Sequence, residues 1–342
     1  MLQNSQLLFI TLLLALLTLR ISQSGLVKEP GGEPEIAGKL APLRLMLVRQ
    51  SEELLPQPQA GLLSGILLGE KTSLPTDFQA AIRNTSTIHM VVASGQNLTI
   101  LSGLVLSLVG FLGRKKTVIL TLVTSAGYAL LTGLQLPIIR AGIMVVLAGL
   151  AQLFNREARP GFVLTVTALA MLIFNPNWLL SVSFQLSFLA TLGVVVVAPA
   201  IIKRVSFLPG LIRQDLIVSA CAQVLTWPVI ASNFHQASTI GLLPNVLILW
   251  TIPLVMVSGT LGLLMSFVSW EVGQVLMLVP DALLTYFVYV VNFFNLPWST
   301  VYVKRLDGLV WAGYYLVLGG LFLLLQSKNV QGVEQKESKV LS

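Results

Sequence analysis

The stretch from Ile88 to Phe111, IHMVVASGQNLTILSGLVLSLVGF, is a largely apolar run interrupted at its centre by four small or polar residues, Ser94, Gly95, Gln96 and Asn97. An apolar run of this length is typical of a membrane span. Polar groups at bilayer depth must find partners inside protein or line a water-filled cavity. We therefore interpret the run as a wall of a pathway across a membrane, because a simple lipid anchor does not explain its centre.

The composition indicates the same class of protein. Of the 342 residues, 55% are hydrophobic and 10% are charged, whereas soluble domains carry about 25% charged residues. Apolar stretches of spanning length recur along the chain, and signal peptides do not repeat. The sequence therefore predicts an all-α fold, a polytopic integral membrane helix bundle of about ten spans with broken or re-entrant helices. After the first segment, the expected spans are residues 88–113, 117–133, 137–154, 161–175, 178–201, 215–234, 242–269, 272–292 and 309–325.

The charges predict an orientation in the membrane. The net charge of +7 fits the positive-inside bias of cytoplasmic loops, and attraction for a polyanion is the alternative. Basic side chains gather at every second turn, in residues 114–116, 156–159 and 203–213. The positive-inside rule places these turns in the cytoplasm, so both termini are expected there and residues 22–86 outside. Lys304 and Arg305 would then also lie outside, which runs against the rule.

The chain divides into four expected parts. They are an N-terminal membrane helix at 1–22, an extracytoplasmic linker with an amphipathic helix at 23–60, a transmembrane domain at 61–326 and a disordered tail at 327–342. The first apolar segment, Leu7–Ile21, lacks a basic start and a small-residue cleavage site. This favours an uncleaved helix over the alternative, a signal peptide.

Three short segments precede the interrupted run. Residues 39–55 predict an imperfect amphipathic helix. Residues 61–69 are apolar but too short to span, so we expect a re-entrant or interfacial piece. Residues 73–86 predict an amphipathic helix with Ser73 or Thr76 as its cap. Its apolar face is formed by residues spaced three and four apart, Phe78, Ala81, Ile82 and Thr85.

The inventory of reactive side chains is small. The single cysteine, Cys221, leaves no internal disulfide, and two histidines are too few for a hydrolase with several histidine ligands. His89 and Ser94 are five residues apart, so on a helix they do not share a face, and no Gly-x-Ser-x-Gly motif is present. We therefore expect no enzyme activity, no cofactor and no bound metal.

Charged and amide side chains inside the expected spans are the candidates for function. Arg140 lies in the span 137–154, where a charge costs about 2.5–3.5 kcal/mol at the bilayer centre. Two interpretations stay open: a residue of a pathway, or a buried arginine bonded to carbonyls of a broken helix. The amide side chains expected to meet in one polar interior are Asn97, Gln185, Asn233 and Asn245. Hydrogen bonds that stabilise the bundle, worth about 0.6–2 kcal/mol each, are the alternative.

Several motifs, in order along the chain, resemble the signature of the ComEC competence protein family. They are Leu67–Glu70 (LLGE), Ala80–Thr85 (AAIRNT), His89 followed by Ala93-Ser94-Gly95, Arg140-Ala141 with Met144, Asn175-Pro176 with Phe184–Phe188 (FQLSF), and Asn245 with Pro253. Each motif alone is weak, but their order and spacing agree with the family over about residues 39–325.

The resemblance implies a multi-pass protein of the cytoplasmic (inner) membrane, a channel or channel subunit that takes up single-stranded DNA during natural competence. A strand crossing the bilayer needs a polar or cationic lining for its phosphates. The candidate pathway residues are Arg83, His89, Ser94, Gly95, Gln96, Asn97, Arg140, Gln185, Ser187 and Asn245. The implied partners are single-stranded DNA, the lipid bilayer, a separate DNA-binding competence protein, a nuclease and a cytoplasmic motor, and a homo-oligomer is compatible with them.

The sequence departs from the family pattern in two ways. Where Leu-His usually follows Ser94-Gly95, this chain has Gln96-Asn97, which keeps hydrogen bonding and loses a titratable group. The region before Lys39 is too short for the family's OB-like domain, and no HxHxDH motif marks its metallo-β-lactamase-like domain. The resemblance is thus to the channel module, with any nuclease step on another polypeptide. Two alternatives remain: a small-solute or lipid-linked transporter on the same fold, and a structural membrane subunit without a pathway.

Overall fold

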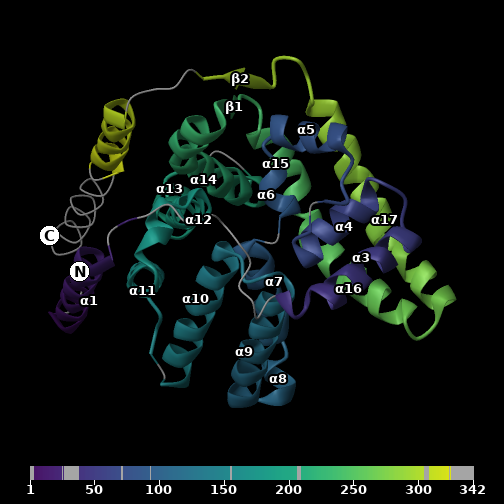
Figure 1. Ribbon diagram of the computed structural model, residues 1–342, viewed down its shortest axis with the longest axis horizontal. Coiled ribbons are helices and arrows are strands. Elements are labelled where there is room, and N and C mark those ends of the chain that lie inside the picture. The colour runs from purple at the N-terminus through teal and green to yellow at the C-terminus, as the bar shows by residue number, and fades with distance from the viewer. Residues whose placement is uncertain are drawn as a thin grey trace, which may run out of the picture.

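The computed structural model describes residues 4–24, 26, 38–70, 72–92, 94–154, 156–205, 209–303, 308–322 and 324. The expected tail at 327–342, Ala93 and the pair Lys304 and Arg305 lie outside these residues. Over the described ranges the chain is helical apart from one two-stranded ribbon. The expectation of an all-α architecture is therefore confirmed (Figure 1).

The helices follow the predicted segments closely. The first half of the chain contains α1 (Asn4–Ser24), α3 (Ala41–Leu54), α4 (Gln59–Leu68), α5 (Thr76–Asn84), α6 (Ile88–Val91), α7 (Gly95–Leu106), α8 (Val109–Leu112), α9 (Arg114–Leu131) and α10 (Leu136–Leu153). The second half contains α11 (Pro160–Phe174), η1 (Pro176–Leu180), α12 (Val182–Leu192), the π-helical turn η2 (Gly193–Val197), α13 (Ala198–Ile202), α14 (Gly210–Phe234), α15 (Leu242–Leu249), α16 (Thr251–Ser266), α17 (Trp270–Phe294) and a last helix, Gly308–Phe322. Strands β1 (Gln236–Ser238) and β2 (Thr300–Tyr302) pair antiparallel.

Fewer helices qualify as membrane spans than expected. Among the described residues, five helices are long and apolar enough to cross a membrane, or six if the bent pair α15 and α16 counts as one span. The five are Gln6–Gln23, Leu136–Leu153, Val182–Ile202, Arg213–Phe234 and Trp270–Phe294. Several expected spans form shorter apolar helices, among them Gly95–Leu106 and Pro160–Phe174. About ten spans are therefore not confirmed.

Both expected breaks are present. The run 88–113 is divided between α6 and α7 by residues in extended conformation, Val92 and Ser94. The span 242–269 bends by 45° between α15 and α16. The bend lies at Trp250 rather than at a proline. Pro253 sits in the first turn of α16, where a missing N–H costs little because that group would have no helical partner.

The largest apolar core joins the helices between residues 41 and 91 to α16 and α17. In it α3 and α4 pack against both α16 and α17, α5 packs against α17, and α6 packs against α4. At its centre Leu63, Ile66 and Phe287 are fully buried. The predicted amphipathic helices at 39–55 and 73–86 form as α3 and α5, although α5 begins at Thr76 after Pro75 and has no side-chain cap.

The short helix α4 occupies an unexpected place. All of its residues from Ala60 to Leu68 are buried. This burial disagrees with an interfacial helix whose apolar face meets lipid, and the other expectation, a re-entrant piece, stays a prediction. A helix that is apolar on all sides leaves no face for water and is stable in the middle of a core. Neighbouring helices come close, since a Cβ on Gly65 would collide with the backbone of Val91.

Contacts between helices form a closed circuit. They run from α16 to α7, α10, α12, α14 and α15, and from α15 back to α16. In the view of Figure 1 this ring surrounds α6. At one end of the ring, Gly241 before α15 lies against Ser86, which connects α5 to α6. The connection between α5 and α6 therefore packs against the start of α15.

Candidate functional site

The polar centre of the interrupted run forms the start of α7. Ser94 is the N-cap, and its hydroxyl oxygen accepts a hydrogen bond from the backbone N–H of Asn97 at 3.4 Å. The Ser94 hydroxyl also donates to Asn97 Oδ1 at 3.0 Å. The Asn97 amide donates to the carbonyl of Ile66 on α4 at 2.8 Å. Asn97 is 1% exposed, so it links two helices and is closed off from solvent.

Arg140 on α10 faces this helix start from the other side. It is 8% exposed. Its Nη1 donates to the carbonyl oxygen of Ser187 and to the hydroxyl of Thr191, both on α12. The guanidinium carbon also lies 6.0 Å from the centre of the Phe188 ring, within reach of a cation–π contact. Among the described residues no carboxylate pairs with Arg140, so a full positive charge is held by neutral groups.

The position of the Arg140 guanidinium leaves no room for a side chain at residue 95, where the chain has glycine. A Cβ at Gly95 would overlap Nη2 of Arg140 and would lie 3.1 Å from the carbonyl oxygen of Pro137. A residue with a side chain would therefore have to push the guanidinium away. Three helices meet here: α7 supplies Gly95, α10 supplies Arg140 and α12 supplies Ser187.

The four amide side chains expected to meet do not bond to one another. Gln185 donates to the carbonyl of Leu179 at 2.9 Å, and Asn233 is exposed and donates to its own helix. Asn245 is 5% exposed, and its Oδ1 has no partner among the described residues. Asn97 is bonded as above. The predicted single polar interior does not form: Asn97, Gln185 and Asn233 each donate to a different backbone carbonyl, and Asn245 bonds to none of them.

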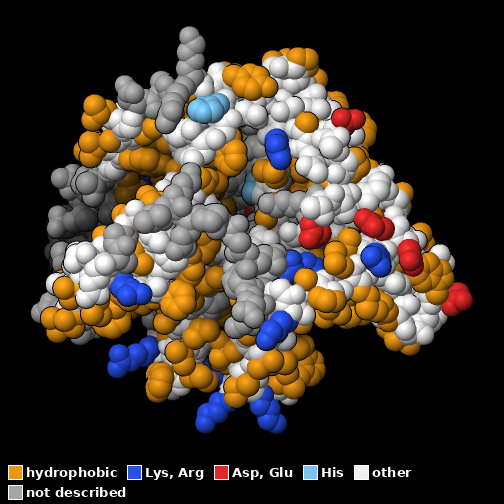
Figure 2. Space-filling view, in the orientation of Figure 1, with side chains coloured by type: hydrophobic (Ala, Val, Ile, Leu, Met, Phe, Trp, Pro, Cys, Tyr) orange, Lys and Arg blue, Asp and Glu red, His pale blue; other side chains and the backbone are white. Residues whose placement is uncertain are grey.

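Arg83 and His89 are accessible side chains of α5 and α6. The His89 ring Nδ1 lies 2.9 Å from the carbonyl oxygen of Ser86, while Arg83 makes no hydrogen bond or ion pair within the described part of the chain. Figure 2 shows that this face of the molecule is hollowed near its centre, with a histidine side chain in the hollow and a basic side chain at its margin. Exposed Gln96, at the start of α7, is also accessible.

Comparison with known proteins places the chain in a family. A sequence model described as Competence protein matches residues 66–328. The chain belongs to the Competence protein family. It is 29% identical to ComE operon protein 3 of Bacillus subtilis (strain 168) over 220 residues, which are 63% of this chain and 28% of that protein. It is also 29% identical to the uncharacterized protein YcaI of Escherichia coli (strain K12) over 149 residues, 41% of this chain and 20% of that protein.

The chain thus spans less than a third of the length of these two curated relatives. No solved structure matches it significantly. The matched region begins within α4 and ends after the last helix, so it includes the α7 start, Arg140 and the whole ring of helices.

In this member of the Competence protein family the sequence-predicted residues fall into three groups. Ser94, Gly95, Asn97, Arg140 and Ser187 gather at the junction of α7, α10 and α12. Arg83, His89 and Gln96 are accessible. Gln185 and Asn245 lie apart from both groups, with no hydrogen bond to either.

Thr191 was missed by sequence reasoning, although a signal existed. It lies four residues after Ser187, so the two share one face of α12. A hydroxyl one turn from an expected pathway residue, in an otherwise apolar helix, marks that face as polar. Within the described residues no group of three His, Cys, Asp or Glu side chains could hold a metal ion.

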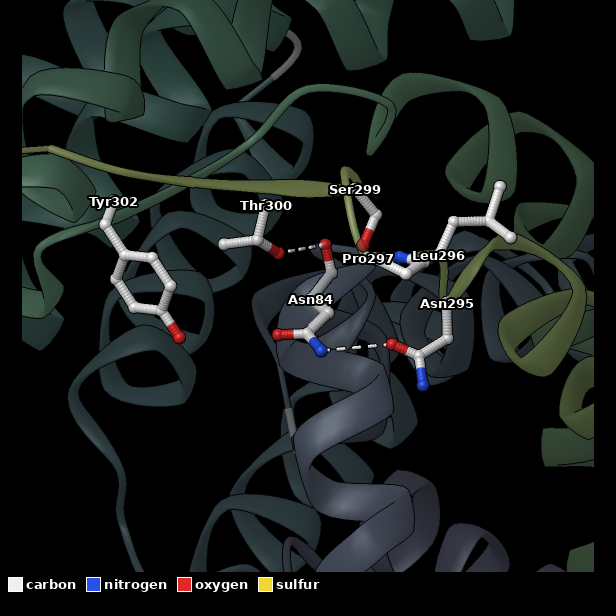
Figure 3. Close-up of a pocket in the computed structure, with 7 residues that line it drawn as sticks. All are labelled: Asn84, Asn295, Leu296, Pro297, Ser299, Thr300 and Tyr302. Carbon is white, nitrogen blue, oxygen red and sulfur yellow. Dashed lines mark hydrogen bonds between the residues drawn. The ribbon is translucent and has the colours of Figure 1, made fainter.

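A pocket at one end of the bundle was also missed. It has a volume of about 270 Å³ and is lined by Asn84, Asn295, Leu296, Pro297, Ser299, Thr300 and Tyr302 (Figure 3). Asn84 donates to Asn295 Oδ1 at 3.0 Å, and the Thr300 hydroxyl donates to the Asn84 carbonyl at 3.2 Å. These bonds join α5 to the segment between α17 and β2. Residues more than two hundred positions apart form this pocket, so local sequence patterns give no sign of it.

Proposed function

We propose that the chain is a multi-pass protein of the cytoplasmic membrane that forms a channel, or a subunit of one, for uptake of single-stranded DNA during natural competence. The proposal goes beyond the family assignment, which names competence and not a transported molecule. The chain itself is proposed to be non-enzymatic. A separate DNA-binding competence protein, a nuclease and a cytoplasmic motor would supply the other steps.

The observation that carries the proposal is a closed ring of contacting helices with a buried arginine between three of them and two accessible basic side chains on neighbouring helices. The ring consists of α7, α10, α12 and α14–α16. Arg140 is held between α7 and α12, and the accessible Arg83 and His89 belong to α5 and α6, whose connection at Ser86 lies against Gly241 before α15. Arginine side chains stabilise phosphates. Contacts to the phosphate backbone do not read bases, so they accept a single strand of any sequence. Such a lining therefore suits a polyanion of variable sequence.

The exposed surface supports membrane insertion. Large apolar side chains are exposed along the candidate spans, for example Leu12 and Leu16 on α1 and Val275, Leu278 and Val279 on α17. In water such a surface would aggregate, whereas lipid tails solvate it without cost. Figure 2 shows many apolar side chains at the surface of the visible face, which fits a bundle that is partly covered by lipid.

A genetic experiment tests the proposal directly. Deleting the gene from a naturally transformable strain should abolish transformation by chromosomal DNA, and the wild-type gene supplied in trans should restore it. A variant with Arg140→Met should restore it poorly, while Arg49→Met, at an exposed position of α3, should restore it fully. Normal transformation in the deletion strain would contradict the proposal.

A biochemical experiment locates the strand. The chain has one cysteine, Cys221, which is buried, so a Cys221→Ser background allows a new thiol to be labelled alone. His89→Cys in that background should react with a water-soluble thiol reagent, and single-stranded DNA should slow the reaction. Ser107→Cys, exposed in the turn after α7, serves as the control and should react equally with and without DNA. Equal protection at both positions would argue for non-specific coating.

The second candidate is a small-solute or lipid-linked transporter on the same fold. The two broken helices favour it, since α6–α7 and α15–α16 resemble the discontinuous helices of secondary carriers. Proteoliposomes distinguish the two. Flux of a small solute that is saturable and unaffected by DNA would support the transporter. Salt-sensitive retention of single-stranded DNA, lost on Arg83→Gln, would support the channel.

A further inference from the structure

The pocket between the end of α5 and the segment from α17 to β2 is lined by neutral side chains (Figure 3). Amide and hydroxyl groups, a leucine, a proline and the ring of Tyr302 surround its volume of about 270 Å³. Pockets for drug-sized ligands have volumes of about 300–1,000 Å³, so this one suits a group of one or two rings. Since its lining carries no charge, it favours a neutral ligand that is flat enough to lie on an aromatic ring and polar enough to bond to an amide.

The two amides of this pocket are only half used. Asn84 Nδ2 donates to Asn295 Oδ1 at 3.0 Å, which orients both side chains. Asn84 Oδ1 and Asn295 Nδ2 make no hydrogen bond within the described residues, so the pair still offers one acceptor and one donor. In Figure 3 the free oxygen of Asn84 points toward the side on which Tyr302 lies and away from Asn295. A ligand between Asn84 and Tyr302 would therefore meet an acceptor on one side and an aromatic ring on the other.

The ring of Tyr302 is available and held in place. Tyr302 is 78% exposed, so a ligand can reach its ring. Its strand β2 pairs with β1, where Tyr302 lies opposite Gln236. The Thr300 hydroxyl on the same strand donates to the Asn84 carbonyl at 3.2 Å. These bonds fix β2 beside the end of α5, so the space between ring and amide exists before a ligand arrives.

The pocket lies at the end of the bundle opposite a basic turn. In Figure 1, β1 and β2 lie at the top of the view, and α8, which leads into the basic turn at 114–116, lies at the bottom. Figure 2 shows basic side chains projecting from that lower end. The positive-inside rule places the basic turn in the cytoplasm, so the pocket faces the outside, where an incoming strand arrives first. Arg83, exposed and adjacent to Asn84 in the chain, adds a positive charge there that attracts phosphates.

We propose that this pocket binds a single nucleobase of the incoming strand, which stacks on Tyr302 and donates an N–H to Asn84 Oδ1. The inference rests on the proposed function and adds to it a subsite that recognises the strand as single. Every base has a π-face and an N–H group on its pairing edge, so the subsite accepts any base. In a duplex those faces and edges are engaged by neighbouring bases. The subsite therefore admits a single strand and excludes duplex DNA.

The test compares two abasic oligonucleotides of equal length, one of which carries a single thymine at its centre, with the full-length protein in detergent. The thymine should tighten binding by about fivefold to a hundredfold, the range for one base stacked on an aromatic side chain. Tyr302→Ala should abolish this preference and leave binding of the fully abasic strand unchanged, and Asn84→Ala should reduce the preference by about twofold to tenfold. Tyr302→Phe should keep it, because the ring remains. Tyr289→Ala, at an exposed tyrosine of α17 outside the pocket, should keep it too.

The outcomes separate the pocket from the uptake function. Equal binding of the two oligonucleotides by the unchanged protein would overturn the pocket without any variant, and DNA protection of a thiol at position 89 would still stand. A thymine preference that survives Tyr302→Ala would also overturn it, because the base would then lie elsewhere. That result is expected if Tyr302 marks the membrane interface, where tyrosines gather. Failure of both oligonucleotides to bind would count against the proposed function as well as the pocket.

Discussion

The core around α4 and the junction of α7, α10 and α12 both hold helices together, but by different contacts. Around α4 the contacts are mostly apolar, and Leu63, Ile66 and Phe287 are fully enclosed. At the junction the contacts are polar and partly unfilled, since Arg140 Nε and the Ser187 hydroxyl have no partner among the described residues. The first region resembles the interior of any stable protein. The second has the character of a site.

The difference teaches where stability and function are placed in this chain. Packing contributes most where every atom has neighbours, and unpaired polar groups reduce stability where they are buried. A protein keeps such groups where a ligand completes them. We therefore expect changes around α4 to affect folding first and changes at the junction to affect binding first. The following predictions test that separation, from the largest expected effect on stability to the smallest.

Phe287→Ala should produce the largest loss of stability. The side chain of Phe287 is 1% exposed at the centre of the core, and its removal leaves a cavity that costs about 3–5 kcal/mol. Tyr289→Ala on the same helix is the control, because Tyr289 is 67% exposed. Thermal unfolding in detergent measures both. Equal shifts for the two variants would show that the α4 core does not dominate stability.

Gly65→Ala should destabilise the fold by about 1–3 kcal/mol through overpacking. The new Cβ would collide with the carbonyl oxygen and the side chain of Val91. The carbonyl belongs to the backbone, so no change of rotamer can relieve that collision. Gly103→Ala on α7 is the matched control, because nothing lies within 4 Å of the new Cβ. It should be neutral or slightly stabilising, since alanine favours helices. A neutral Gly65→Ala would contradict the close approach of α4 and α6.

Asn97→Ala should cost about 1–2 kcal/mol, because this amide links the two regions. The carbonyl of Ile66 accepts from Asn97 at 2.8 Å and from the Tyr128 hydroxyl at 3.4 Å. Either donor alone keeps that carbonyl satisfied. Asn97→Ala combined with Tyr128→Phe should therefore destabilise by more than the sum of the single changes. Strict additivity in unfolding measurements would show that the two donors do not share this acceptor.

Asn233→Ala should have the smallest effect, within about 0.5 kcal/mol. Asn233 is exposed and donates to Val229 in its own helix, so its removal leaves no buried group unpaired. Transformation should also stay at the wild-type level. A strong loss of transformation with normal unfolding would reassign Asn233 to the pathway and weaken the distinction between the two regions.

Local sequence patterns predicted the helices and their breaks well, but they did not predict which helices pack against each other. The break at Ser94 followed from small and polar residues in an apolar run, and it is present. The helix at 73–86 followed from its spacing, and its face of Phe78, Ala81 and Ile82 is buried. The burial of α4 in the core was not predicted, because an apolar nine-residue stretch fits a bilayer surface and a protein core equally well.

The candidate site shows the same limit. Arg140 stood out because charge is rare in a span, but its contact with Gly95 depends on how α7 packs against α10. The amides of Gln185 and Asn245 were expected to meet others, yet residue type says nothing about the nearest carbonyl. The Arg140–Gly95 contact and the partners of the amide side chains both depend on how the helices are spaced. The residue pattern within one helix does not determine that spacing.

The π-helical turn η2 has a mechanical consequence. Gly193 brings its backbone against the carbonyl of Cys221 on α14, and a Cβ at Gly193 would lie 2.7 Å from that oxygen. Two backbones in direct contact have no rotamers between them with which to absorb a change in spacing. We expect this seam to stay shut, so that α12 and α14 shift as one rigid unit. If the proposed pathway widens, we expect α7 and α12 to separate first, because the Arg140 side chain between them can move.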